Sequence, residues 1–96
     1  MPVTIGRFGV WSNFDRLPAD EVRDFARSAE RLGYNAFWTQ ETAGRDPFAL
    51  LAGLAAVTST IRLGVGIAVI YGRDAVAMRA GAATVHELSG GRLILG

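Results

Sequence analysis

The stretch IRLGVGIAVI, residues 61–70, decides the fold class of this chain. It is almost continuously apolar, which is typical of a strand covered on both faces in a parallel sheet. Gly64 and Gly66 interrupt it, and a glycine inside a strand often marks a bulge or a close approach of the backbone. A dinucleotide-binding turn is not predicted, because Val69 replaces the third glycine of that motif and the segment does not open a helix.

Helical patterns flank this strand on both sides. Upstream, Asp46 and Pro47 provide an N-cap and a first-turn residue. The apolar positions that follow at helical spacing are Phe48, Leu51, Leu54, Ala55 and Thr58. Downstream, Asp74 is expected to cap a helix that runs through Leu88 and ends at the glycines behind it. The apolar stripe predicted for this helix consists of Ala77, Ala80, Gly81, Thr84 and Leu88.

The same alternation continues towards both ends of the chain. A short strand is predicted at 35–40, preceded by a helix that starts at Pro18 and stops at Gly33. The predicted inner face of that helix consists of Val22, Phe25, Ala26, Ala29 and Leu32. Residues 3–10 are expected to form a first strand that reaches Trp11, and residues 92–95 to begin a fourth.

The resulting order is βαβαβαβ with short loops, which indicates an α/β protein with a parallel sheet. Two architectures share this order: an open doubly wound sheet and the first half of a (β/α)8 barrel, also called a TIM barrel. We favour the half barrel, since the chain stops inside an apolar strand and so resembles a piece of something longer. Residues 1–96 are then expected to form one incomplete barrel domain.

Composition excludes several classes of function. The 96 residues are 50% hydrophobic with a net charge of +1, which argues against a nucleic-acid partner. The longest near-apolar runs, 48–57 and 63–72, fall short of the roughly 18 residues of a membrane span, so no membrane association is expected. Gly6 and Arg7 stand where a signal peptide would need unbroken apolar residues. We therefore expect a cytoplasmic protein.

Candidate functional residues follow from the strand ends, because both architectures place ligands at the carboxyl edge of the sheet. Glu41 comes directly after the second strand, with a solvated loop carboxylate as the alternative. Trp11 ends the first strand, where its aromatic face could wall a planar ligand. Tyr71 and Arg73 follow the third strand, and the arginine would meet either a phosphate or a nearby carboxylate. The only histidine, His86, is expected on a solvated helix surface, and no metal site is predicted.

A longer motif is present at the C-terminal end. The string Glu-Leu-Ser-x-Gly-Arg-x-x-Leu-Gly occupies 87–96 and resembles the luciferase-like monooxygenase superfamily. Upstream, residues 38–41, 44–48 and 63–67 are similar to the branch of that superfamily that uses the deazaflavin coenzyme F420. The resemblance covers essentially the whole chain, but only the N-terminal portion of a family member.

The resemblance implies a (β/α)8 barrel that holds a flavin or deazaflavin at the carboxyl ends of its strands. In many members a bulge in the third strand, often with a non-proline cis peptide, backs the tricyclic ring. The matching positions here are Gly66, Ile67 and Ala68. By the same resemblance, Trp11 would wall the ring and Glu41 would lie near its reactive edge as the catalytic residue. In relatives, later barrel segments hold most of the cofactor's phosphate-bearing tail.

The chain departs from the family pattern beside the candidate catalytic residue. Many relatives place an Asp-His pair after the second strand, where this chain has Glu41 and Thr42. The acidic role is therefore expected to pass to Glu41, whereas the histidine role has no occupant.

The function implied is that of an F420-dependent oxidoreductase, which moves a hydride between the deazaflavin and a small organic substrate. The alternative on the same scaffold is an FMN-dependent monooxygenase. A non-catalytic alternative is a truncated half barrel whose exposed strand edges pair with another chain. The expected partners are thus a small-molecule substrate and either a second copy of this chain or a separate C-terminal half.

Overall fold

The computed structural model of the chain describes residues 8–12, 14–41, 44–68 and 74–96. Helices and strands alternate along these residues, and the predicted order βαβαβαβ is confirmed. The elements are β1 (Gly9–Trp11), α1 (Ala19–Arg31), β2 (Ala36–Gln40), α2 (Pro47–Ala55), β3 (Arg62–Ile67), α3 (Ala75–Leu88) and β4 (Leu93–Leu95). The outer parts of the strands predicted at 3–10 and 61–70 lie outside the described residues.

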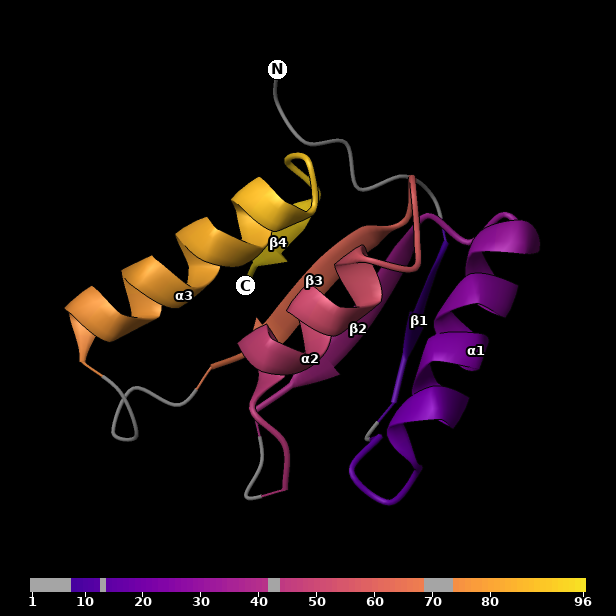
Figure 1. Ribbon diagram of the computed structural model, residues 1–96, viewed down its shortest axis with the longest axis horizontal. Helices are drawn as coiled ribbons and strands as arrows, with labels where there is room; N and C mark the ends of the chain where they lie inside the picture. The colour runs from indigo at the N-terminus through magenta and orange to yellow at the C-terminus, as the bar shows by residue number, and fades with distance from the viewer. Residues whose placement is uncertain (1–7, 13, 42–43, 69–73) are drawn as a thin grey trace.

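The four strands form one parallel sheet in the order β1-β2-β3-β4. Figure 1 shows the three helices side by side over one face of this sheet, and the molecule measures only 21 Å along its shortest axis. A doubly wound sheet would reverse its strand order and carry helices on both faces. Sequential strands with helices on a single face are instead the arrangement of a (β/α)8 barrel that is open on one side.

The hydrophobic core lies between the sheet and the helices. Alternate strand residues point into it, among them Phe37, Leu63 and Val65, and each is fully buried. The aromatic ring of Phe14, from the loop after β1, stacks on Phe37 with ring centroids 4.7 Å apart. Since period-2 alternation places every second residue on the same face, the remaining strand residues point to the face without helices.

Two aspartates begin helices as the sequence predicts. The carboxylates of Asp46 and Asp74 each accept a hydrogen bond of 2.7 Å from the backbone N–H three residues on, at Ala49 and Ala77. At the other end of α1 the chain turns at Gly33, whose φ of +89° favours glycine. No helix in the described ranges is both long and apolar enough to cross a membrane.

The stripe predicted for α3 is wrong. Of its members Ala77, Ala80, Thr84 and Leu88 are exposed, and the face that packs on the core is rotated by about one position. That inner face consists of Met78, Gly81, Ala82 and Val85. The physical reason is α2: at Gly81 a Cβ would stand only 3.4 Å from the ring of Phe48, so the close contact between the two helices selects this face.

The predicted inner face of α1 is correct at Val22, Ala26 and Ala29, which are buried. Leu32 is wrong, because α1 ends before it and its side chain is 77% exposed. Phe25 is 41% exposed and lies at the edge of the core, where its ring contacts that of Phe14.

A carboxylate binds the loop between α2 and β3 at the amino end of the sheet. Glu30, from α1, accepts hydrogen bonds from the backbone N–H groups of Ser59, Thr60 and Ile61 at 2.7 to 2.9 Å. Burial alone would raise the pKa of Glu30, but these donors outweigh it and hold the pKa below its usual value. The negative charge of Glu30 is therefore part of the folded structure.

A buried arginine binds the carbonyl side of the same loop. Arg92 is 7% exposed, and burial lowers its pKa, an effect that the charge of Glu30 opposes. Its guanidinium uses all five N–H groups, as a planar fork can. The acceptors are the carbonyl oxygens of Ser89, Ala55, Ile61 and Thr58 and the hydroxyl of Thr58. Arg92, the arginine of the C-terminal motif, thus joins the end of α2 to the start of β4.

We predict that Arg92→Met lowers the free energy of unfolding by about 3 kcal/mol or more, because several buried oxygens lose their donors. Urea unfolding followed by tryptophan fluorescence measures this loss. The matched control is Arg27→Met on the surface of α1, where the ion pair to Asp24 is exposed and spans 3.8 Å. Equal stability of the two variants would contradict the structural role of Arg92.

Candidate functional site

The face of the sheet without helices carries two stacked tryptophans. Trp11 pairs in register with Trp38, and Trp38 pairs with Gly64, so the three residues lie in one row on the same face. The two indole rings have centroids 6.1 Å apart and planes inclined by 21°. Trp38 is half-buried on this open face, and Trp11 is 52% exposed.

Glycines in β3 make room for these two rings. A Cβ on Gly64 would stand 2.4 Å from the ring of Trp38, and a Cβ on Gly66 only 2.0 Å from the ring of Trp11. Real Cβ atoms do not approach ring carbons so closely, so any larger residue at either position would displace an indole. The predicted close approach of the backbone is confirmed. We call these four residues, Trp11, Trp38, Gly64 and Gly66, the tryptophan platform.

The bulge predicted in β3 is also confirmed. Thr39 pairs with Val65, but the next residue of β2, Gln40, pairs with Ile67, so Gly66 is the extra residue of the ladder. A bulge bends the strand and re-aims the side chains that follow it. The non-proline cis peptide that often accompanies this bulge in relatives is not present among the described residues, whose peptide bonds are trans.

The bulge is hydrogen-bonded to the candidate catalytic residue. The backbone N–H of Glu41 donates to the carbonyl oxygen of Ile67 at 2.8 Å, directly after β2 ends. Glu41 is half-buried, and Ile67 is 55% exposed. The structure therefore brings together four of the five predicted site residues, Trp11, Glu41, Gly66 and Ile67, at the carboxyl ends of three neighbouring strands.

The fifth predicted site residue lies elsewhere. Ala68 is half-buried and packs against the hydrophobic core, so it supports the bulge from the side of the helices. Thr42, Tyr71 and Arg73, considered for the same edge, lie outside the described residues. His86 is exposed in the last turn of α3, as expected.

The chemistry offered by this edge is that of a planar, largely apolar surface, with the carboxylate-bearing residue Glu41 directly after β2. Such a surface suits a flat ring, since aromatic rings stack in offset geometry on one another. No group of three His, Asp or Glu side chains that could hold a metal ion occurs in the described part of the chain.

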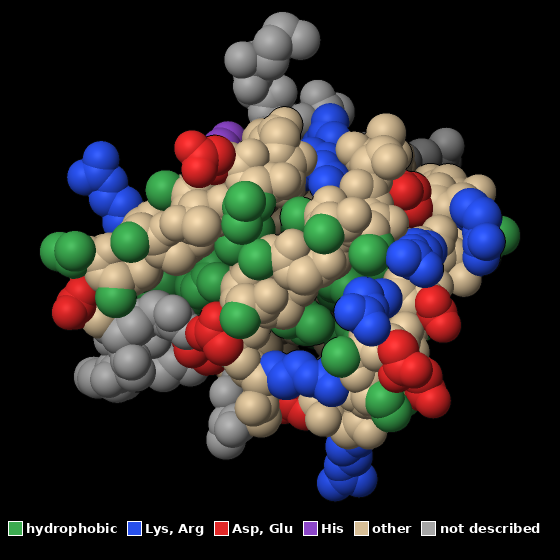
Figure 2. Space-filling view, in the orientation of Figure 1, with side chains coloured by type: hydrophobic (Ala, Val, Ile, Leu, Met, Phe, Trp, Pro, Cys, Tyr) green, Lys and Arg blue, Asp and Glu red, His purple; other side chains and the backbone are tan. Residues whose placement is uncertain are grey.

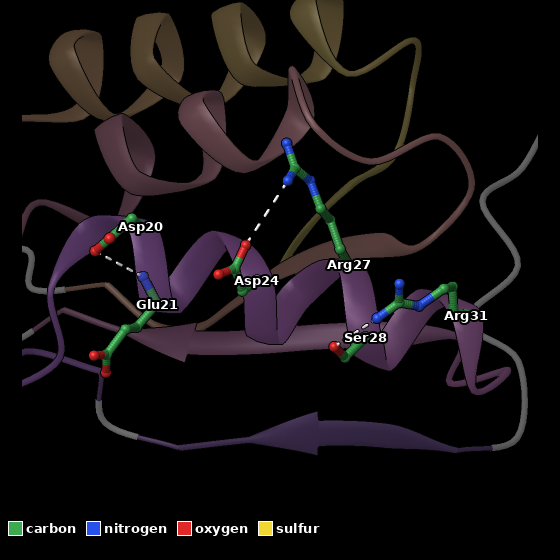
Figure 3. Close-up of polar contacts among 6 residues, drawn as sticks. All are labelled: Asp20, Glu21, Asp24, Arg27, Ser28 and Arg31. Carbon is green, nitrogen blue, oxygen red and sulfur yellow. Dashed lines mark hydrogen bonds and ion pairs between the residues drawn. The ribbon is translucent and has the colours of Figure 1, made fainter.

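The helix side of the molecule has a different character. Figure 2 shows charged side chains over α1 and hydrophobic side chains where α2 and α3 adjoin. In Figure 3 polar side chains of α1 contact one another along the helix: Arg27 pairs with Asp24, and Arg31 donates to the Ser28 hydroxyl at 3.0 Å. Exposed contacts of this kind contribute little, so this surface offers no built site.

Fold and site together define a class of protein. It is a parallel (β/α) half barrel that gathers an aromatic surface and a carboxylate at the carboxyl ends of its strands, where barrels of this kind bind ligands. The sequence matches the family described as luciferase-like monooxygenase over residues 3–96. The chain belongs to this family, and the resemblance inferred from its motifs is confirmed.

Individual relatives agree with this assignment. Over 80 residues the chain is 35% identical to a 5,10-methylenetetrahydromethanopterin reductase of Methanolobus tindarius. The aligned stretch covers 82% of this chain and 24% of the relative. A solved structure of the coenzyme F420-dependent tetrahydromethanopterin reductase of Methanopyrus kandleri superposes with a TM-score of 0.86 at 29% identity, over 93% of this chain and 26% of that one.

A second solved structure comes from the monooxygenase side of the family. The monooxygenase RslO1 of Streptomyces bottropensis superposes with a TM-score of 0.82 at 26% identity, over 95% of this chain and 32% of that one. The chain thus has the fold of the N-terminal part of a (β/α)8 barrel and spans about a quarter to a third of the length of these proteins.

We predict that Gly66→Ala displaces the ring of Trp11, because the new methyl group would overlap it. The variant is expected to shift the tryptophan emission spectrum and to lose about 1–3 kcal/mol of stability, the usual range for overpacking. The matched control is Gly53→Ala on α2, where a Cβ meets nothing within 4 Å. This control should keep the wild-type spectrum and be slightly stabilised; a wild-type spectrum in both variants would contradict the platform.

Proposed function

We propose that this chain forms the ring-binding part of a coenzyme F420-dependent oxidoreductase, which transfers a hydride between the deazaflavin and a small organic substrate. The observation that carries the proposal is the bulge at Gly66, with Trp11 packed on it and Glu41 hydrogen-bonded beside it. The two reductase relatives, one of them named as F420-dependent, favour the deazaflavin. The proposal includes a cytoplasmic location.

The described residues fit the ring of such a cofactor. The indole of Trp11 packs on the backbone of Gly66, and Trp11 and Ile67 are each more than half exposed, so a planar ring has apolar surface to contact. The fit is limited to the ring. The guanidinium of Arg45, near this edge, is already engaged by the carbonyl oxygens of Phe14 and Leu17, so it is not available to hold the phosphate-bearing tail.

Each residue then has a distinct role. When bound, the deazaflavin supplies the hydride chemistry, while the protein supplies orientation and electrostatics. The bulge at Gly66 and the side chain of Ile67 would back the ring and Trp11 would wall it, while Ala68 supports the bulge from the core. Glu41 holds its carboxylate at the strand ends, where it can orient the substrate or accept a proton as a general base.

Two alternatives have observations of their own. An FMN-dependent monooxygenase on this scaffold is favoured by the likeness to RslO1, a monooxygenase. A half barrel without catalysis, which pairs with a second copy or with a separate C-terminal half, is favoured by the strands at the two edges of the sheet, β1 and β4, which each have one neighbour. In either case residues 1–96 act as one unit.

We predict saturable binding of coenzyme F420 in the micromolar range, followed by quenching of tryptophan fluorescence, with FMN titrated in parallel. Both tryptophans of the chain lie at the site, so the quenching reports directly on it. Gly66→Val should abolish binding and Gly53→Ala should preserve it. Preference for FMN would favour the monooxygenase, and binding of neither cofactor by the wild-type chain would overturn the ring-binding proposal.

We predict that Glu41→Gln leaves the cofactor affinity within about twofold and lowers the rate of hydride transfer by a factor on the order of 100 or more, as for loss of a general base. The rate is measured by rapidly mixing reduced F420 with methylenetetrahydromethanopterin, the compound in the name of the reductase relative. The wild-type rate is the reference. An unchanged rate would return Glu41 to the role of a solvated loop carboxylate.

A further inference from the structure

Arg45 connects the two loops that leave β1 and β2. It lies between β2 and α2, and its guanidinium donates to the carbonyl oxygen of Phe14 at 2.6 Å and to that of Leu17. The Phe14 oxygen also accepts from the Leu17 N–H at 3.1 Å, which closes the turn after β1. The bonded residues are 28 and 31 positions apart in the sequence, so Arg45 links separate parts of the chain.

A second contact joins the same loops. At Gly44 a Cβ would stand 2.4 Å from the carboxyl carbon of Asp15, so the side chain of Asp15 lies directly against the backbone of Gly44. The turn that receives Arg45 is itself fixed to the sheet, because Phe14 is 3% exposed and stacks on Phe37 of β2. Figure 1 shows both loops along the lower edge of the molecule, at the carboxyl ends of their strands.

These loops lead directly from the candidate site. Trp11 precedes Phe14 by three residues, and Glu41 precedes Arg45 by four. We propose that Arg45 is a positioning residue, which holds the loop after Trp11 against the loop after Glu41. It thereby fixes the position of the Trp11 ring relative to Glu41. For the cofactor this rests on the function proposed above; for the arrangement of the two tryptophans it does not.

Arginine suits this role for a chemical reason. A planar guanidinium bonds two carbonyl oxygens at once in fixed geometry, whereas the ammonium of lysine is a single point charge on a flexible stem. Arg23 provides a matched control. It lines the same surface hollow of about 280 Å³ between α1 and α2, and its side chain makes no hydrogen bond or ion pair with other residues in the described ranges.

We predict that Arg45→Met weakens the circular-dichroism couplet of the stacked Trp11–Trp38 pair and raises the dissociation constant for F420 about tenfold. The second effect follows because the site must then be ordered on binding. Arg45→Lys should fall between this variant and the wild type, and Arg23→Met should match the wild type in both measurements. All four proteins are compared well below their melting temperatures, so that only the folded state is observed.

Two results would overturn the proposal. If Arg45→Met melts at a lower temperature but keeps the wild-type circular-dichroism couplet and the wild-type dissociation constant for F420, Arg45 only stabilises the turn and does not position Trp11. If Arg23→Met changes both measurements equally, the effect is one of surface charge. Should the wild-type chain bind neither F420 nor FMN, the proposed function fails, while the couplet still decides whether Arg45 positions Trp11.

Discussion

The hydrogen bonds of the buried guanidinium of Arg92 are the constraint on which the rest of the structure depends. Four backbone oxygens and one hydroxyl converge on it from the end of α2, the loop before β3 and the turn before β4. Glu30 binds the N–H groups of the same loop from α1. Without these partners, a loop at the amino end of the sheet would leave buried polar groups unpaired. The pair Glu30 and Arg92 thus fixes where β3 begins.

Fixing the start of β3 has consequences at its other end. Residues alternate between the two faces of a strand, so a slip of one position would exchange Leu63 and Val65, which fill the core, with Gly64 and Gly66, which admit the tryptophans. The burial of Leu63 and Val65 therefore opposes such a slip. The hydrogen bonds of Glu30 and Arg92 oppose the same slip, because they fix where the strand begins, and so help to keep the register that the candidate site at the carboxyl end requires. The family motif at 87–96 therefore acts on both ends of β3: Arg92 lies at the amino end, and the N–H of Gly96 donates to the carbonyl oxygen of Val65, beside Gly66, at 2.7 Å.

The sequence predicts the order of elements, the two aspartate caps and the bulge, because each depends on local chemistry that a few neighbouring residues carry. It also predicts which strand ends meet, since parallel strands present their carboxyl ends at one edge. The inner face of α3 could not be predicted, because it is selected by the ring of Phe48 on a helix far back in the sequence. The same holds for Arg45, whose short loop motif reveals nothing of the carbonyls of Phe14 and Leu17 that it binds. Contacts over long sequence separations, rather than periodicity, decide these features.

The tryptophan platform also shows which packing contacts are missing on the open face of this half barrel. In a closed barrel, side chains from alternate strands fill the interior in layers, so each large residue has partners on the opposite wall. Here two indoles lie over glycines on one wall, and Trp11 remains 52% exposed. A planar ring held against Trp11 and Ile67 would cover part of that surface, and the remainder needs further protein. On our proposal the site is therefore shared: this chain supplies the bulge, the wall and the carboxylate, whereas the groups that hold the anionic tail and close the barrel come from protein beyond this sheet.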